Sequence, residues 1–128
     1  MSKSIVYDKS VAFATRIMRM CNYLHDNKKE YIISNQIGRS GTSIGANISE
    51  ALNSISYKEY LSKMYISLKE CRETLYWLDI LAKTGLITTT QYNSMHYDCC
   101  ELFRMLTAIA RTTRTRLNAT NKSKKNQP

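Results

Sequence analysis

The sequence predicts an all-α protein, an up-down-up-down antiparallel four-helix bundle. Apolar residues recur at spacings of three and four in four successive segments, which is the period of amphipathic helices. The 128 residues include one proline and four glycines, too few for the many turns of an all-β fold. Short polar connectors between the segments favour antiparallel neighbours. We expect one bundle domain at residues 1–117 and a disordered basic tail at residues 118–128, where nothing is apolar enough to bury.

The first helix is expected from about Tyr7 to Asn27, followed by a polar, unperiodic loop that includes Glu30. One apolar stripe follows from helical spacing, and its members are Val11, Ala14, Ile17, Met18, Cys21 and Leu24.

The second helix is expected from Ile32 or Ser34 to Asn53, and it carries three of the four glycines. So many glycines would usually indicate a loop, but their spacing places Gly38, Gly41 and Gly45 on one stripe. A second stripe is apolar: Ile33, Ile37, Ile44, Ile48 and Ala51. A third is polar: Gln36, Arg39, Ser43, Asn47 and Glu50. We therefore expect a helix that another helix approaches closely along its glycines.

The last two helices have clear start and stop signals. Ser56 and Glu59 match a capping box at the start of the third helix, and Gly85 is the expected left-handed residue after its last turn at Lys83. Thr88 and Gln91 repeat the capping pattern before the fourth helix. That helix carries a heptad-like seam: Tyr92, Met95, Cys99, Leu102, Leu106, Ile109 and Thr113.

Charge is unevenly distributed along the chain. Nineteen Lys and Arg against ten Asp and Glu give a net charge of +9, and no acidic residue follows Glu101. Beyond it lie the candidate phosphate contacts: Arg104, Arg111, Arg114, Arg116, Lys122, Lys124 and Lys125. A basic end of this kind favours polyanions such as nucleic acid, although a solubilising tail would have the same composition.

Residue patterns for catalysis or metal binding are missing from the sequence. His25 and His96 have no neighbour at ligand spacing, and no phosphate-binding loop or nucleophile elbow occurs. The four cysteines show no CxxC spacing. Three of them fall on apolar stripes, as buried thiols would: Cys21, Cys71 and Cys99. We therefore expect no cofactor, no metal and no enzymatic activity. No apolar run approaches the ~20 residues of a membrane span, and the first residues lack a signal-peptide core, so we expect a cytoplasmic protein.

Two interactions between helices are suggested by the side chains. Arg39 on the second helix can meet Glu70 and Glu73 on the third as a structural, charge-assisted contact. Most aromatic residues lie on the last two helices: Tyr57, Tyr60, Tyr65, Tyr76, Trp77, Tyr92 and Tyr97. They are compatible with core packing and self-association, with which the glycine stripe agrees, or with base stacking. We favour core and interface roles.

Three blocks of sequence resemble the 23S rRNA intervening-sequence protein family. The first block runs from Gln36 to Ala51, the second from Ser56 to Lys63, and the third from Glu70 to Gly85. The residues that carry the resemblance are also interface candidates: Gln36, Arg39, Ser40, Ser43, Asn47, Glu50, Glu70, Glu73 and Trp77. Such proteins often have Glu-Gly where this chain has Glu50-Ala51.

The resemblance implies a small cytosolic bacterial protein that assembles as a homopentamer of bundles around a channel. It also implies a fold like that of the accessory protein of diversity-generating retroelements, a basic pentamer that partners a reverse transcriptase and binds nucleic acid. Our leading hypothesis is a non-enzymatic basic homo-oligomer that contacts RNA or DNA phosphates through its C-terminal cations. The alternative is a protein-interaction accessory subunit, for example of a reverse transcriptase.

Overall fold

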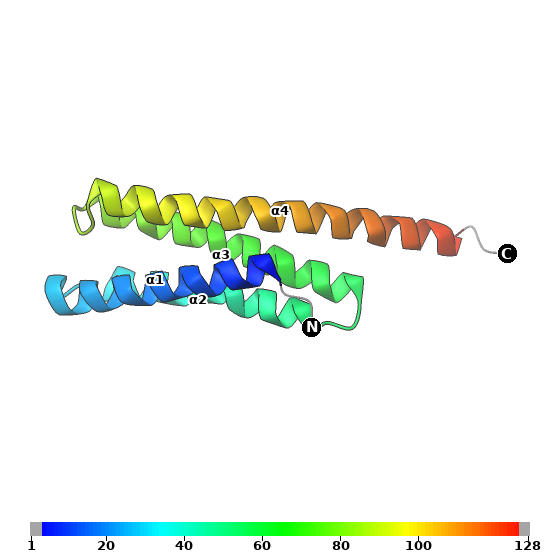
Figure 1. Ribbon diagram of the computed structural model, residues 1–128, viewed down its shortest axis with the longest axis horizontal. Coiled ribbons are helices and arrows are strands. Elements are labelled where there is room, and N and C mark those ends of the chain that lie inside the picture. Colours follow the sequence, from blue (N-terminus) through cyan, green and yellow to red (C-terminus); the bar gives the residue numbers. More distant parts are fainter. Residues whose placement is uncertain (1–3, 126–128) are drawn as a thin grey trace.

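The computed structural model describes residues 4–125 and places nearly all of them in helices. These are α1 (Ile5–Lys28), α2 (Ile32–Leu52), α3 (Tyr57–Lys83) and α4 (Thr89–Lys125). Consecutive helices run in opposite directions and pack side by side, and α4 also contacts α1 (Figure 1). Within residues 4–125 there is no β-strand. The predicted all-α antiparallel four-helix bundle is confirmed.

The helix boundaries follow the capping residues that the sequence contains. Ser56 Oγ accepts a hydrogen bond from the Glu59 amide at 3.1 Å. Thr88 and Gln91 cap α4 reciprocally, because Thr88 Oγ1 accepts from the Gln91 amide at 3.1 Å and Gln91 Oε1 accepts from the Thr88 amide at 2.8 Å. Gly85 has φ 73°, the left-handed conformation expected after α3. These predictions are confirmed.

Glu30 lies in the connector between α1 and α2, as predicted, and there it caps the start of α2. Its carboxylate accepts hydrogen bonds from the amides of Ile32, Ile33 and Ser34 at 2.9, 3.0 and 2.8 Å. These are amides of the first turn of α2, which have no partner inside the helix. Burial alone would raise the pKa of Glu30, but the hydrogen bonds from these amides outweigh it and lower the pKa.

The glycine stripe of α2 packs against α1 of the same chain. A Cβ atom added to Gly41 would lie 2.8 Å from Ile17 Cγ1, and one added to Gly45 would lie 2.7 Å from Ser10 Oγ. At Gly38 the nearest atom would be Cys21 Sγ at 3.3 Å. The expected close approach of a helix is confirmed. Because α1 occupies this stripe, the stripe is no longer an argument for contact with another copy of the chain.

The predicted apolar stripe of α1 is wrong at two positions. Val11 and Met18 are 46% and 48% exposed. Because α2 offers glycines to α1, the helix turns Ser10 and Ile17 toward them and leaves Val11 and Met18 at the surface. The residues of α1 that are buried instead are Val6, Ser10, Phe13, Ile17, Cys21 and Leu24.

The seam of α4 supplies its side of the core as predicted. Met95, Cys99, Leu102, Leu106 and Thr113 are buried, and they pack with buried residues of α3 such as Met64, Cys71 and Leu78. The regular steps of three and four keep this seam facing the bundle over several turns.

The expected disordered tail is a helix in the described part. Instead of ending near residue 117, α4 continues to Lys125 and projects beyond the other three helices (Figure 1). No glycine or proline interrupts residues 118–125, and Thr120 Oγ1 donates a hydrogen bond to the Arg116 carbonyl at 3.0 Å. The side chains of residues 118–124 are exposed, so backbone bonding and helix propensity, not packing, form this segment. Residues 126–128 of the expected tail lie outside the described part.

Candidate nucleic-acid interface

Arg39 joins α2 to α3 through two carboxylates, as the sequence predicts. Arg39 Nη1 lies 3.2 Å from Glu70 Oε2, and its other terminal nitrogen pairs with Glu73. Glu73 in turn accepts a hydrogen bond from Trp77 Nε1 at 3.1 Å. The guanidinium is half exposed and fully engaged with these carboxylates, so this cluster stabilises the contact between the two helices.

Further polar contacts between α2 and α3 are buried. The hydroxyls of Ser40 and Thr74 are hydrogen-bonded to each other at 2.9 Å. Ser67 Oγ donates to the carbonyl of Ile44 at 2.8 Å, which satisfies a hydroxyl with no access to water. The polar residues at this contact therefore fix how α2 and α3 pack.

The remaining polar residues of α2 lie nearer the surface. Glu50 pairs with Lys63 of α3 at 3.0 Å, while Asn47 Nδ2 bonds to the Ser43 carbonyl of its own helix at 2.8 Å. Gln36 is exposed. With Arg39, most of this stripe acts inside one chain, while the side chains of Gln36 and Ser43 have no hydrogen bond within the described residues.

The carboxylates of α3 and α4 all interact with other groups of the bundle. Asp98 pairs with Arg16, and Glu101 pairs with Lys9 at 3.0 Å, which ties α4 to α1. Asp79 accepts a hydrogen bond from Tyr92 at 2.6 Å, and this bond raises the pKa of Tyr92 to about 12. Of the remaining carboxylates, Glu59 accepts a hydrogen bond from the Ile55 amide at the start of α3. Glu70 and Glu73 both pair with Arg39.

The outward side of α3 and α4 carries a cluster of exposed cations, and the carboxylate on the same stripe of α3, Asp79, accepts the hydrogen bond from Tyr92. We call this side the basic face, and its residues are Lys69, Arg72, Arg104, Arg111, Arg114 and Lys122. At about 100° per residue, the two cations of α3 fall within about 60° of arc and the four of α4 within about 80°. All six are exposed, and none forms an ion pair within the described residues.

Two contacts across the helices place these cations beside aromatic rings. The guanidinium of Arg72 lies 5.4 Å from the ring centroid of Phe103, and that of Arg114 lies 5.3 Å from the ring centroid of Tyr65. Both distances are within the range of cation–π attraction. A shallow hollow of about 240 Å³ lies beside the second pair, lined by residues that include Leu68, Arg111 and Arg114. The two helices therefore share one basic, aromatic groove.

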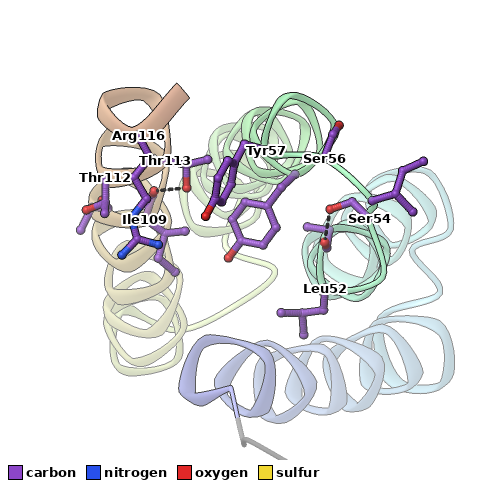
Figure 2. A pocket seen from close by; sticks show the side chains of 12 residues that line it. Leu52, Ser54, Ser56, Tyr57, Ile109, Thr112, Thr113 and Arg116 are labelled. Carbon is purple, nitrogen blue, oxygen red and sulfur yellow. Dashed lines mark hydrogen bonds between the residues drawn. The ribbon is translucent and has the colours of Figure 1, made fainter. Parts of the chain in front are cut away.

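Three of the seven predicted phosphate contacts do not belong to this face. Arg116 lies about 140° around α4 from Arg111. It lines a hollow of about 690 Å³ at the end of the bundle, together with Leu52, Tyr57 and Ile109 (Figure 2). Lys124 lies about 160° from Lys122. Lys125 ends the described helix, and its side chain is outside the described part. The other four predicted contacts lie on the basic face: Arg104, Arg111, Arg114 and Lys122.

No candidate metal or redox centre is found in the described residues. No cluster of three or more His, Cys, Asp or Glu side chains there could hold a metal ion. His25 packs against Tyr31, and His96 lies near Cys100. Burial raises the pKa of the Cys21 thiol, and the nearby Glu30 carboxylate adds to this effect.

Among the described helices, none has the length and apolar character that crossing a bilayer requires.

The family model described as 23S rRNA-intervening sequence protein matches residues 2–108. The chain belongs to this family. A crystal structure of a protein of unknown function from the S23 ribosomal protein family of Bacteroides thetaiotaomicron VPI-5482 is similar to this chain. The two chains are 45% identical with a TM-score of 0.82, over 83% of this chain and 98% of that chain. A search of curated proteins finds no match.

Sequence reasoning missed the contribution of α3 to the basic face. A signal was present, because Tyr65, Lys69, Arg72 and Tyr76 recur at spacings of four, three and four. They were not connected with the cations of α4, because the alignment of two antiparallel helices depends on the core side chains of both. Two contacts in the structure show how the helices are aligned: Arg114 lies against Tyr65, and Arg72 lies against Phe103.

Proposed function

We propose that this member of the family is a non-enzymatic binding protein that contacts nucleic-acid phosphates through the basic face. One observation carries the proposal: six exposed cations without ion pairs share one side of α3 and α4, while each carboxylate of these helices is engaged by another group of the chain. Such segregation leaves a one-sided positive field that attracts polyanions.

RNA is the first ligand to test. The family description refers to an intervening sequence of 23S rRNA. Exposed Arg and Lys side chains on a helix surface are suited to phosphate oxygens, which position a protein on nucleic acid without reading bases. Phosphate contacts release counterions, so affinity should fall steeply as salt rises.

The test is a titration of labelled structured RNA with the full chain across a salt series. We expect the logarithm of the association constant to fall linearly with the logarithm of salt concentration, with a slope of about −0.9 per phosphate contact. Arg111→Gln and Arg114→Gln should each reduce the magnitude of this slope by about 1. Arg116→Gln is the matched control, because it removes the same charge from the same helix but not from the basic face. Binding that ignores salt, or equal effects of Arg116→Gln and Arg111→Gln, would contradict the proposal.

The proposed assembly is a homo-oligomer, a pentamer of bundles. Its support is a groove of about 590 Å³ between α1 and α2, whose walls include Val11, Ala14, Met18 and Ala46. Exposed apolar side chains beside small residues suit the packing of another helical surface. The groove lies on the helix pair that does not carry the basic face, so assembly and nucleic-acid binding are compatible.

The second candidate function is that of an accessory subunit for another protein, such as a reverse transcriptase. The same α1–α2 groove favours it, because an apolar groove can receive a protein of different sequence. Removal of residues 118–128 should then leave the association intact, since the groove lies on other helices. Glu substitutions at Val11 and Met18 should abolish it. Loss of the partner on truncation alone would argue against this alternative.

A further inference from the structure

We infer that the basic face binds single-stranded nucleic acid, with unpaired bases stacked on Tyr65, Tyr76 and Tyr97. The inference rests on the proposed function and specifies its ligand. Phosphate contacts alone do not distinguish a single strand from a duplex, whereas exposed aromatic rings among the cations do, because every unpaired base has a flat surface to stack.

The three tyrosines lie on the stripes that form the basic face. Tyr65 and Tyr76 bracket Lys69 and Arg72 on α3, and Tyr97 lies about 20° around α4 from Arg104. They are 37%, 56% and 62% exposed, in that order, although rings of this size gain most from burial. Rings and cations therefore share the same surface, which is the composition of a binding surface for a single strand.

Contacts on the protein side hold two of the rings in place. Arg114 lies over the ring of Tyr65, and its planar guanidinium can itself stack against a base. The ring of Tyr76 meets that of Trp77 edge-on, with centroids 4.9 Å apart. Trp77 is fixed by its hydrogen bond to Glu73. Because these rings are already ordered, little conformational entropy is lost when a base stacks on them.

The other aromatic residues of α3 and α4 are committed elsewhere. Tyr92 donates to Asp79, and Phe103 is partly buried beneath Arg72. Tyr57 and Tyr60 line the hollow at the end of the bundle. The exposed tyrosines of the basic face are thus a distinct subset.

The geometry disfavours a duplex as the preferred ligand. In a duplex the bases are stacked on each other, so their flat surfaces cannot reach rings on a shallow groove between two helices. Stacking on Tyr65, Tyr76 and Tyr97 requires bases that are free to turn outward, as in single strands, loops and ends.

The test compares three labelled probes with the full chain across a salt series that begins at low salt: a single-stranded RNA of about twelve nucleotides, the corresponding duplex, and an abasic strand of the same length. We expect the RNA strand to bind more tightly than either of the others. Tyr65→Leu, Tyr76→Leu and Tyr97→Leu should each weaken binding of the strand by about tenfold, while leaving the salt slope and the abasic affinity unchanged. Tyr65→Phe should bind like the unmodified chain.

Tyr23→Leu is the matched control, because Tyr23 is an exposed tyrosine of α1, outside the basic face. Equal binding of strand, duplex and abasic probe, with salt dependence retained, would overturn the inference and leave the proposed function standing. Failure to bind any probe at low salt would overturn both. A change in oligomer mass without loss of strand affinity in the tyrosine variants would assign these rings to protein contacts and overturn the inference.

Discussion

The α1–α2 pair and the α3–α4 pair are both antiparallel helix pairs, but they are packed in opposite ways. Between α1 and α2 the contact is made by glycines, with Gly41 against Ile17 and Gly45 against Ser10. Between α3 and α4 the contact is a seam of bulky side chains that includes Leu78 and Leu106. Their outer surfaces differ too: the first pair exposes Val11 and Met18, and the second exposes the basic face.

The difference shows how the packing of a helix pair decides which surface is left for a partner. Where glycines make the contact, apolar residues of α1 that do not fit it remain on the outside and line a groove. Where bulky residues fill the contact, the outer positions of α3 and α4 are free to carry Arg, Lys and Tyr. One fold therefore offers two chemically distinct surfaces.

The largest effect is expected from filling the glycine contact. Gly41→Leu should destabilise the fold by about 3 kcal/mol, because the added side chain collides with Ile17 in a closely packed contact. Urea unfolding measures this loss. Ala12→Leu, at an exposed position of α1, is the control and should change stability by less than about 0.5 kcal/mol. Equal stability of the two variants would mean that the glycine contact is not tightly packed.

A smaller loss is expected at the cluster that joins the two pairs. Arg39→Ala should destabilise the fold by about 1 kcal/mol, because it leaves Glu70 and Glu73 facing each other without a cation in a half-exposed site. Arg111→Ala on the basic face should leave stability within about 0.5 kcal/mol of the unmodified chain. Chemical unfolding of both variants separates structural from surface arginines. Equal losses of stability in the two variants would contradict the structural role assigned to Arg39 but not to Arg111.

Introducing charged side chains into the groove between α1 and α2 tests the proposed assembly. Val11→Glu combined with Met18→Glu should lower the mass of the assembly in solution and leave monomer stability nearly unchanged, because both side chains are about half exposed. Light scattering after size-exclusion chromatography measures the mass. Ile5→Glu, another exposed apolar position of α1, should have no effect. A monomeric unmodified chain, or an unchanged mass in the double variant, would contradict the proposed assembly.

The last prediction concerns the effect of pH at the start of α2. Glu30→Gln should lower stability at neutral pH by about 1 kcal/mol through the weakened cap. Because the folded state lowers the pKa of Glu30, its contribution is present above the unfolded pKa of about 4.3 and is lost as pH falls through the folded pKa. Thermal unfolding from neutral to acidic pH should show the two proteins converging. With Asp26→Asn, at an exposed site nearby, no such convergence is expected.

Much of the fold could be predicted because its determinants are local. Ser56, Thr88 and Gly85 each act on residues within one turn, and the α4 seam repeats regularly. The face of α1 that is buried could not be predicted, because Val11 and Ile17 are equally apolar in sequence. Only the glycines of α2 decide between them, and that contact is between different helices.

The candidate site was predictable in part for the same reason. The cations of α4 are visible as a run without acidic residues, and Arg39 was correctly paired with Glu70 and Glu73. The meeting of Arg114 with Tyr65 depends on the alignment of two antiparallel helices, which the sequence does not state. The extension of α4 was missed because a polar, basic composition describes both disordered tails and exposed helices.

Because the projecting end of α4 is helical, the distances between its charged residues along the helix axis are fixed. As part of a helix, Lys122 stays about 16 Å along the axis from Arg111 and about 20° around it. One alanine inserted before Asn118 would turn Lys122 away from the groove by about 100° without changing the net charge of the chain. The extension therefore fixes where its cations lie relative to the basic face, and their position depends on an unbroken helix rather than on their number.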